Sequence, residues 1–429
     1  MKFLEEKFIP VAAALGEQRH LVAIRDGFVV TMPITIAGAL AVLLLNFGGI
    51  FAKTGLNMPS VQEAYVNFLK TTGLTNILST INRSTLSMLA VLSVTSIAYH
   101  LAKRYDSDGM AAGAIAMGCY LGLTPAGETG AVESGFLGST GVFVAMIVAI
   151  ISTEIFVRLS RNKKLKITMP DGVPPAVAKS FSSLLPGLIS IALVSAMGTI
   201  IAQVTGLNVW ELITKFVSAP LTNIADSAGT AFFETTLMNL LWIFGLHGTN
   251  IVGSITGTIL GPLNLENMDL YAAGKEPIHT YTGASHSVFA MMGGSGCTLG
   301  ALIAIFLFSK SKANRTVAQI AIAPGLFNIN EPVTFGLPIV MNPVYAIPFV
   351  VGPTVLAVTT YFLMQLGIVG RICISAPWVT PPILLQFLAT GGNIPAAIWG
   401  AVEIVLLTIL WTPFVMMSYK MEQKNTAED

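Results

Sequence analysis

The sequence predicts an all-α polytopic integral membrane protein. Charged residues make up 10% of the 429 positions, hydrophobic residues make up 53%, and the mean hydropathy is +0.73. A chain with so little charge cannot cover itself with water-soluble groups, so lipid must surround most of it. A helix needs roughly 20 predominantly apolar residues to cross the hydrocarbon core, and this chain has many uncharged stretches of that length.

Ten uncharged stretches mark the candidate spans. They cover residues 27–52, 84–102, 109–127, 134–153, 180–210, 235–265, 277–309, 332–370, 372–402 and 404–419. Several are longer than one crossing needs and contain Gly, Pro, Asn and Thr, which indicates broken helices or re-entrant hairpins around a cavity. We expect about ten transmembrane helices with re-entrant hairpins and amphipathic surface helices. Residues 3–15 form either such a surface helix or a solvated cap.

The distribution of lysine and arginine predicts the topology. Basic residues cluster at Arg19 and Arg25, Lys103 and Arg104, 158–166, 310–315, and 420–424. The positive-inside rule places these clusters, and both termini, in the cytoplasm. An even number of crossings must then separate any two clusters, but only three are obvious between Lys166 and Lys310. Either residues 209–225 cross as well, or one apparent span turns back inside the membrane.

Several classes of function are excluded. The formal charge of +1 leaves no basic tail or patch for a nucleic-acid partner. No GxxxxGK[ST] loop is present, so energy must come from a gradient or a partner protein. The five histidines and three cysteines lack the spacing of metal ligands. We therefore expect no metal and no cofactor.

Small residues recur every fourth position in three places. Gly253, Gly257 and Gly261 form one series, and Gly109 with Gly113 and Gly296 with Gly300 form two pairs. This spacing is typical of helices that approach one another closely in a membrane. We expect a packing role for these glycines.

Two ionisable residues lie inside apolar stretches, where charge is costly and usually functional. His247 lies in WIFGLHGTN at 242–250, and Glu331 lies in PGLFNINEP at 324–332 as the only acid between Arg315 and Glu403. Since a Pro- and Gly-broken segment suits an unwound turn at membrane depth, Glu331 is a candidate for a buried binding site.

The neighbours of these two residues suit a sugar. Asn328 and Asn330 offer amides that donate and accept, while Trp242 and Trp378 offer aromatic faces for the apolar side of a pyranose ring. A structural cap or a buried hydrogen-bond network is the alternative. In MMGGSG at 291–296, Gly294 and Ser295 would either bring backbone close to a ligand or let two helices touch.

The motifs FGLHG around His247 and PGLFNINEPVTFGLPIVMNP around Glu331 carry a family resemblance. The chain resembles the IIC membrane component of the lactose/cellobiose/N,N'-diacetylchitobiose branch of the bacterial phosphotransferase system (PTS EIIC). The resemblance implies a permease in the bacterial cytoplasmic membrane that binds and translocates a β-linked disaccharide. It also implies a homodimer, with residues 1–225 as the dimerisation half and residues 226–429, with two re-entrant hairpins, as the substrate half.

The resemblance also assigns roles to the candidate residues. His247 and Glu331 would face the 6-hydroxyl of the sugar and act in its phosphorylation, with Trp242, Asn328, Asn330 and Trp378 as nearby contacts. The phosphoryl group would arrive from a phosphocysteine on a cytoplasmic EIIB partner. Because only a short tail follows Tyr419, we expect EIIB to be a separate chain. Phosphotransferase activity would require both proteins.

Two other classes of membrane protein compete with this interpretation. In a proton- or sodium-coupled secondary sugar transporter, Glu331 and His247 would form a proton relay. Such a carrier needs only an ion gradient and releases unchanged sugar, whereas the phosphotransferase permease needs phosphorylated EIIB and releases sugar phosphate. A channel or a purely structural protein would show no saturable sugar binding.

Overall fold

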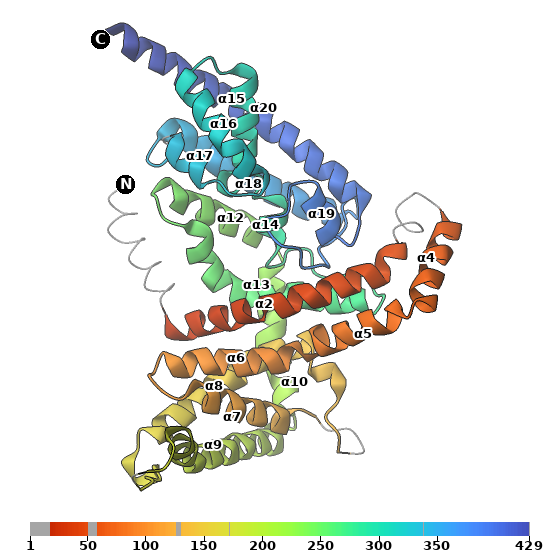
Figure 1. The fold of residues 1–429 in the computed structure, drawn as a ribbon, viewed down its shortest axis with the longest axis vertical. Helices are drawn as coiled ribbons and strands as arrows, with labels where there is room; N and C mark the ends of the chain where they lie inside the picture. The colour runs from red at the N-terminus through yellow and green to blue at the C-terminus, as the bar shows by residue number, and fades with distance from the viewer. Residues whose placement is uncertain (1–17, 50–57, 126–129, 171, 338, 429) are drawn as a thin grey trace. The chain divides into compact units, whose positions relative to one another are not determined.

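The computed structural model describes residues 18–49, 58–125, 130–170, 172–337 and 339–428. Within these ranges the chain is helical and contains no β-strand (Figure 1), which confirms the all-α prediction. The surface helix predicted for residues 3–15 lies outside the described residues. The chain divides into two compact units, which we call unit 1 (residues 1–38 and 80–223) and unit 2 (residues 39–79 and 224–429).

Unit 1 consists of apolar helices joined by short turns. Its main helices are α2 (Arg19–Asn46), which continues into unit 2, α6 (Leu89–Lys103), α7 (Gly109–Leu123), α8 (Val142–Ser160) and α9 (Pro175–Thr205). Helices α6, α7 and α8 contact one another, and α9 packs on α7 and α8 (Figure 1). The shorter elements are η3 (Leu86–Met88), η4 (Ser134–Phe136), η5 (Ser139–Gly141), η6 (Lys163–Leu165), α10 (Val209–Ile213), η7 (Thr214–Ser218) and α11 (Ala219–Ala225).

Small residues allow the close contact between α6 and α7. Helix α7 begins after Asp108, whose carboxylate accepts hydrogen bonds from two backbone N–H groups of the first turn. A Cβ added to Gly109 would lie 2.7 Å from the Tyr99 ring, and one added to Gly113 would lie 3.0 Å from the Thr95 carbonyl oxygen. Both glycines therefore have the predicted packing role.

Unit 2 alternates long helices with short, broken ones. Its elements are η2 (Phe47–Gly49), α4 (Pro59–Thr71), α5 (Leu74–Ser84, which ends in unit 1), α12 (Ala228–Ile243), α13 (Gly248–Ala272), α14 (Ser285–Phe289), η8 (Ser295–Cys297), α15 (Thr298–Phe308), α16 (Lys312–Leu326), α17 (Glu331–Gly336), α18 (Pro343–Gln365), α19 (Leu384–Ala389) and α20 (Ile394–Glu428). Helix α12 packs on α18, and α15 packs on α20. Trp411, Phe349 and Tyr345 are buried in one of its hydrophobic cores.

Two segments of unit 2 have the broken character expected of re-entrant hairpins. In the first, α14 has five residues and leads through Gly293, Gly294 and Gly296, all with positive φ, into α15. In the second, residues 366–393 contain only the six-residue helix α19. Positive φ is accessible to glycine at little cost, so these residues permit tight turns that would strain other residue types.

The glycine series in unit 2 differ in their packing. A Cβ on Gly300 would lie 2.8 Å from the Leu407 backbone, and one on Gly296 would lie 2.1 Å from the Phe349 ring. By contrast, a Cβ on Gly257 would meet nothing within 4 Å among the described residues. The packing role predicted for Gly257 therefore stays a prediction, whereas a Cβ on Gly283 would lie 3.1 Å from the Gly261 backbone nitrogen.

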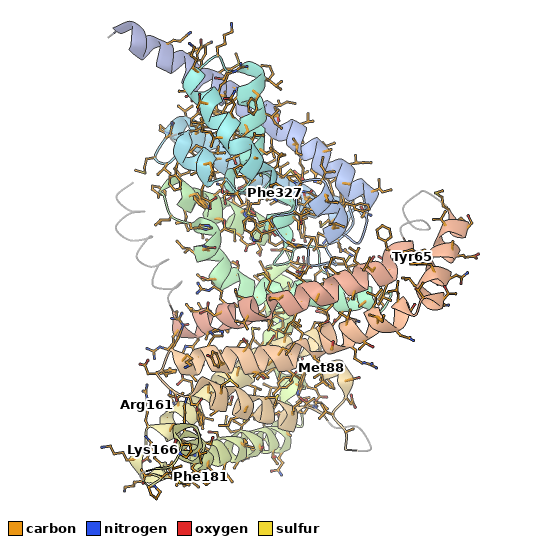
Figure 2. All side chains as sticks on the ribbon, in the orientation of Figure 1. Tyr65, Met88, Arg161, Lys166, Phe181 and Phe327 are labelled. Atoms are coloured by element: carbon orange, nitrogen blue, oxygen red, sulfur yellow. The ribbon has the colours of Figure 1, made fainter. Side chains whose placement is uncertain are left out.

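Six helices in the described residues are long and apolar enough to cross a membrane. They are Arg19–Asn46, Leu74–Lys103, Ser139–Ser160, Val177–Thr205, Pro343–Gln365 and Ile394–Lys420, and Gly109–Leu123 and Ser295–Phe308 are shorter apolar helices. Large apolar side chains are exposed on several of them, such as Phe181 on α9 (Figure 2). The chain is thus a multi-pass membrane protein, while the total of about ten crossings stays a prediction.

Candidate functional site

The broken segments of unit 2 surround a cavity of about 470 Å³. Its lining comes from the α12–α13 junction, α14 and the turn after it, the α16–α17 junction, and the loop before α19. The lining residues are Trp242, His247, Thr249, Asn250, Ser287, Met291, Ser295, Asn328, Asn330, Glu331 and Trp378. Seven of the eight residues predicted for the site are in this set, and the eighth, Gly294, lies directly against Asn330.

The FGLHG motif forms the turn that presents His247. Gly245 has a φ of 75°, and a Cβ on Gly248 would lie 1.8 Å from the Met238 carbonyl oxygen, so both positions require glycine. His247 is the N-cap of α13, and its Nδ1 accepts the backbone N–H of Asn250 at 3.3 Å. An acceptor at Nδ1 places the proton of the neutral ring on Nε2. His247 can therefore donate a hydrogen bond to a ligand from Nε2.

Glu331 presents a free carboxylate to the cavity. It is the first residue of α17, and Pro332 follows in the first turn, where the missing N–H of proline costs nothing. The side chain is exposed, and its carboxylate has no hydrogen-bond or ion-pair partner among the described residues. Both carboxylate oxygens are thus available to hydroxyl groups of a ligand.

Asn328 ties three of the lining segments together. Its Oδ1 accepts the backbone N–H of Gly293 at 2.9 Å, while its Nδ2 donates to the carbonyl oxygens of Trp378 at 2.7 Å and Thr380 at 2.9 Å. The residue has a φ of 63°, a conformation that asparagine tolerates better than most residues. Both amide hydrogens bond to backbone carbonyl oxygens. Asn328 is therefore part of a buried hydrogen-bond network, the alternative to a sugar contact that the sequence left open.

Asn330 has a similar arrangement around Gly294. Its Nδ2 donates to the Ser295 carbonyl oxygen at 3.1 Å and to Thr334 Oγ1 at 2.9 Å. A Cβ on Gly294 would lie 2.4 Å from the Asn330 Cβ, so glycine lets the hairpin turn approach this side chain. We expect Gly294 and Asn330 to shape the wall of the cavity.

The two tryptophans of the cavity differ in exposure. Trp242 is 3% exposed, and its ring centroid lies 4.5 Å from that of His247. Part of its surface is therefore covered by the histidine. Trp378 is 46% exposed. Of the two, Trp378 has the face that is free to stack on a pyranose ring.

Sequence reasoning missed two hydroxyl residues of the lining. Thr249 Oγ1 lies 3.1 Å from Ser295 Oγ, and Ser287 Oγ donates to the Ala284 carbonyl oxygen at 2.9 Å. Thr249 follows the FGLHG motif directly, so the motif itself could have indicated it. Ser287 carries no such signal, because only the fold of the hairpin brings it to the cavity.

Other buried ionisable groups of unit 2 lie outside the cavity lining. Glu234 accepts hydrogen bonds from Tyr281 Oη at 2.7 Å and from Thr256 Oγ1. Glu403 is completely buried and accepts a hydrogen bond from Thr360 Oγ1 at 3.0 Å. No group of three or more His, Cys, Asp or Glu side chains suited to a metal ion occurs in the described part of the chain.

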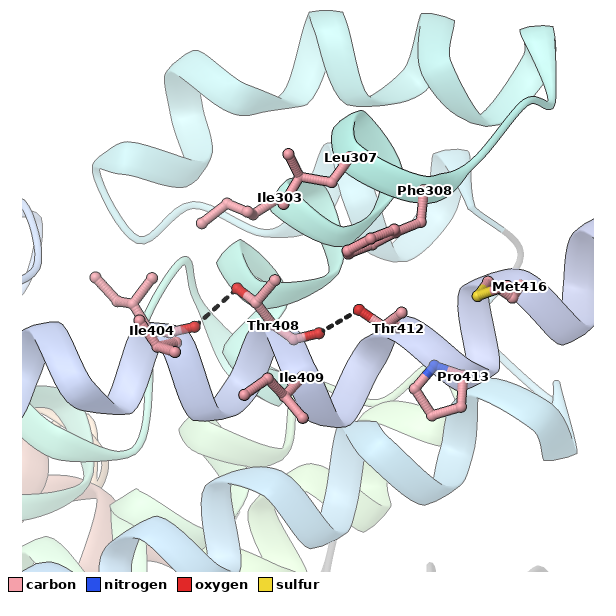
Figure 3. Close-up of a pocket in the computed structure, with 10 residues that line it drawn as sticks. Ile303, Leu307, Phe308, Ile404, Thr408, Ile409, Thr412, Pro413 and Met416 are labelled. Carbon is pink, nitrogen blue, oxygen red and sulfur yellow. Dashed lines mark hydrogen bonds between the residues drawn. The ribbon is translucent and has the colours of Figure 1, made fainter.

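A second cavity in unit 2, of about 610 Å³, differs in chemistry (Figure 3). It lies between α15 and α20 and is lined by aliphatic and aromatic side chains together with Thr408 and Thr412. The hydroxyls of these threonines donate to the carbonyl oxygens of Ile404 and Thr408, at 2.8 and 2.7 Å. With no free polar group, this cavity does not suit a sugar.

Comparisons with known proteins place the chain among transporters. Residues 25–353 match the model of the family described as "Phosphotransferase system, EIIC". The lichenan permease IIC component of Bacillus subtilis is 35% identical over all of this chain and 96% of that protein. A lactose-specific EIICB component of Streptococcus mutans is 29% identical, covering 96% of this chain and 71% of that protein. The crystal structure of ChbC, the IIC component from the N,N'-diacetylchitobiose-specific phosphotransferase system, matches with a TM-score of 0.86 and 35% identity over 99% of both chains.

Proposed function

Because the chain belongs to the phosphotransferase system EIIC family, we propose that it is the permease for a β-linked disaccharide of the cellobiose, diacetylchitobiose or lactose type. The cavity of unit 2 supports this proposal. It combines a free carboxylate, an imidazole N–H and an exposed indole, which together suit the hydroxyls and the apolar face of a sugar. The observation that carries the proposal is that His247 and Glu331 both line this cavity.

The two residues would divide the chemistry at the 6-hydroxyl. The oxygen of the sugar's 6-hydroxyl would attack the phosphorus of phosphorylated EIIB, and Glu331 would accept the proton of that hydroxyl. The phosphorus–sulfur bond to the EIIB cysteine would break, leaving a thiolate on EIIB and a phosphate ester on the sugar. His247 would orient the hydroxyl oxygen through Nε2–H. Phosphoryl transfer depends chiefly on such positioning and on charge stabilisation, which fits a site with few reactive groups.

The partner and the assembly also belong to the proposal. The Streptococcus mutans relative is an EIICB component, which supports EIIB as the partner of this chain. We further propose a homodimer formed through residues 1–225, with residues 226–429 carrying the substrate site and both termini in the cytoplasm. The sugar would cross by alternating access as the substrate half moves.

Sugar binding by the purified chain tests the site. In lipid nanodiscs, titration with cellobiose, lactose and diacetylchitobiose should show saturable binding of at least one of them. His247→Ala should weaken that binding on the order of tenfold, because one hydrogen bond is lost and the Trp242 ring loses its neighbour. The matched change His100→Ala, at a half-buried histidine of unit 1, should leave the affinity unchanged. Equal losses in both variants would remove His247 from the site.

A further inference from the structure

The ends of several unit 1 helices meet at one place. His20, near the start of α2, bonds to Glu154, near the end of α8, with 2.9 Å between Nε2 and Oε1. Lys179, near the start of α9, pairs with Asp108, before α7, at 3.3 Å. We call this region, residues 18–26, 103–108 and 154–180, the basic end. Four candidate spans of unit 1 therefore begin or finish there.

In the sequence, the basic end has ten basic and five acidic residues. The basic ones are Arg19, Arg25, Lys103, Arg104, Arg158, Arg161, Lys163, Lys164, Lys166 and Lys179, and the acidic ones are Asp26, Asp106, Asp108, Glu154 and Asp171. Such an excess on one surface attracts anions over about a Debye length. The surface thus suits an anionic partner.

The segment after α8 holds the least neutralised charges. Asn162 Oδ1 accepts the backbone N–H of Lys164 at 3.0 Å and shapes the short turn η6. Lys163, Lys164 and Lys166 are exposed, and none pairs with an acid among the described residues. This turn follows directly on the span that ends at Ser160. Its ammonium groups therefore lie where the chain leaves the hydrocarbon.

Two guanidinium groups are held beside this turn by Tyr105. The Cζ atoms of Arg19 and Arg161 lie 4.7 and 5.4 Å from the centroid of the Tyr105 ring. Arg161 Nη2 also donates to the Tyr105 carbonyl oxygen at 3.1 Å, and Tyr105 Oη donates to Glu154. Guanidinium groups held in this way lose little freedom on binding, and their remaining N–H groups suit phosphate oxygens.

Exposed apolar side chains continue from the basic end along α9. Phe181, Leu184 and Leu188 follow Lys179 and are 41%, 48% and 63% exposed. Figure 2 shows Phe181 at the same end of unit 1 as Arg161 and Lys166. Fixed cations at the end of an exposed apolar span match the headgroup and the acyl chains of a phospholipid.

We propose that the basic end is a binding surface for anionic phospholipid headgroups, whose acyl chains lie along the exposed side of α9. Arg19, Arg161 and the lysines of residues 163–166 hold the phosphate. A positive juxtamembrane cluster gains favourable energy from each basic residue near an anionic surface. The bound lipids would stabilise unit 1 and do not depend on the sugar site.

Thermal unfolding of the full chain in nanodiscs tests the proposal. The wild-type chain should unfold at a higher temperature in phosphatidylcholine with phosphatidylglycerol than in phosphatidylcholine alone, and high salt should shrink the difference. The double variant K163Q/K164Q should lose phosphatidylglycerol affinity by about tenfold or more. The matched double variant K310Q/K312Q, which removes two exposed lysines of unit 2, should keep the wild-type shift.

Three results would overturn the proposal. One is an equal lipid shift in wild type and K163Q/K164Q, with R161Q also unchanged. Another is full stabilisation by inorganic phosphate in pure phosphatidylcholine, which would make the site one for free phosphate. The third is an unchanged lipid shift in K163Q/K164Q accompanied by weaker binding of phosphorylated EIIB, which would assign the surface to that protein.

Discussion

Unit 1 and unit 2 bury different kinds of polar group. Every buried polar residue of unit 1 within the described part of the chain is a serine or threonine, such as Ser152, whose hydroxyl donates to the Val148 carbonyl oxygen one turn earlier. Unit 2 also buries carboxyl, amide and imidazole side chains, namely Glu234, Asn239, Asn264, Asn267, His279, His286, Asn328, Asn330, Gln386 and Glu403. Among them, Asn267, Asn328 and Asn330 bond to backbone groups of the broken segments.

The difference follows from helix continuity. An unbroken helix satisfies its own backbone, so a serine in it needs no distant partner. A broken helix leaves N–H and C=O groups that must be paired by side chains. Asn267 illustrates this role, because its amide bonds to the backbone of residues 278 and 279, before the first hairpin segment, and of residue 372, within the second. Unit 2 therefore uses buried polar groups to build the cavity that unit 1 does not need.

The largest effect that this comparison predicts is at Glu331. Glu331→Gln keeps the size of the side chain but removes the base, so sugar phosphorylation in the presence of phosphorylated EIIB should fall by on the order of a hundredfold or more. Glu133→Gln, at an exposed acid of unit 1, is the matched control and should retain the wild-type rate. The rate of sugar phosphate formation in proteoliposomes measures both. Similar losses in the two variants would refute the assignment of Glu331.

A smaller but still large effect is expected at Asn328. Asn328→Asp replaces the Nδ2 donor with an oxygen facing the carbonyl oxygens of Trp378 and Thr380, so three acceptors would meet without a donor. The loss should cost about 1–3 kcal/mol of stability and weaken sugar binding. Thermal unfolding and sugar titration should therefore shift together. Lost affinity with unchanged stability would instead make Asn328 a direct sugar contact.

His279, Asp226 and Glu266, which we call the His279 cluster, predict that the stability of unit 2 depends on pH. His279 Nδ1 lies 3.6 Å from Asp226 Oδ2, and Nε2 lies 2.8 Å from Glu266 Oε2. His279 lies in the connection between α13 and α14, outside the six helices that are long and apolar enough to cross a membrane. Burial lowers the pKa of His279, but these two carboxylates outweigh it and raise the pKa to about 9, from an ordinary value of 6.5. Burial raises the pKa of Asp226, but bonds with His279 and the backbone N–H groups of Tyr281 and Thr280 lower it overall.

The sign of the pH effect follows from proton linkage. Since folded His279 holds its proton more tightly than the unfolded chain does, its contribution is complete below pH 6.5 and is lost as pH rises through about 9. The contribution of Asp226 is present above its ordinary pKa and is lost in acid. The melting temperature should thus fall between pH 6.5 and 9, and His279→Gln should flatten that slope. An equally steep slope in the variant would show that the His279 cluster does not cause the pH dependence.

The smallest effect is expected in unit 1. Ser152→Ala removes a hydroxyl that bonds within its own helix, and the carbonyl oxygen it releases keeps its helical partner. We expect a change in the free energy of unfolding below about 1 kcal/mol, with unchanged sugar transport. Denaturation in mixed micelles measures it. A loss as large as that of Asn328→Asp would mean that the two units do not differ in this way.

The sequence predicted the class of fold and most of the cavity lining, for a physical reason. His247 and Glu331 are conspicuous because ionisable groups inside apolar stretches are costly. The glycines of FGLHG were visible as a motif, but their reasons, the turn at Gly245 and the contact of Gly248 with Met238, required coordinates. The sequence shows which polar side chains are present, but it does not show which of them already have hydrogen-bond partners in the folded chain.

Three features could not be predicted for that reason. The amide hydrogens of Asn328 bond to backbone that is 50 and 52 residues away in the chain. Ser287 reaches the cavity only through the fold of its hairpin. Gly257 has the spacing of a packing glycine, yet it has no neighbour within 4 Å of an added Cβ among the described residues. Each depends on a contact that is distant in sequence.

The most direct test of the central claim is uptake of labelled β-disaccharides into vesicles that contain this protein, with and without phosphorylated EIIB, followed by identification of the internal product. Our account predicts sugar phosphate inside the vesicles only when phosphorylated EIIB is present. Accumulation of unmodified sugar without EIIB, abolished when the proton or sodium gradient collapses, would contradict it and identify a secondary transporter.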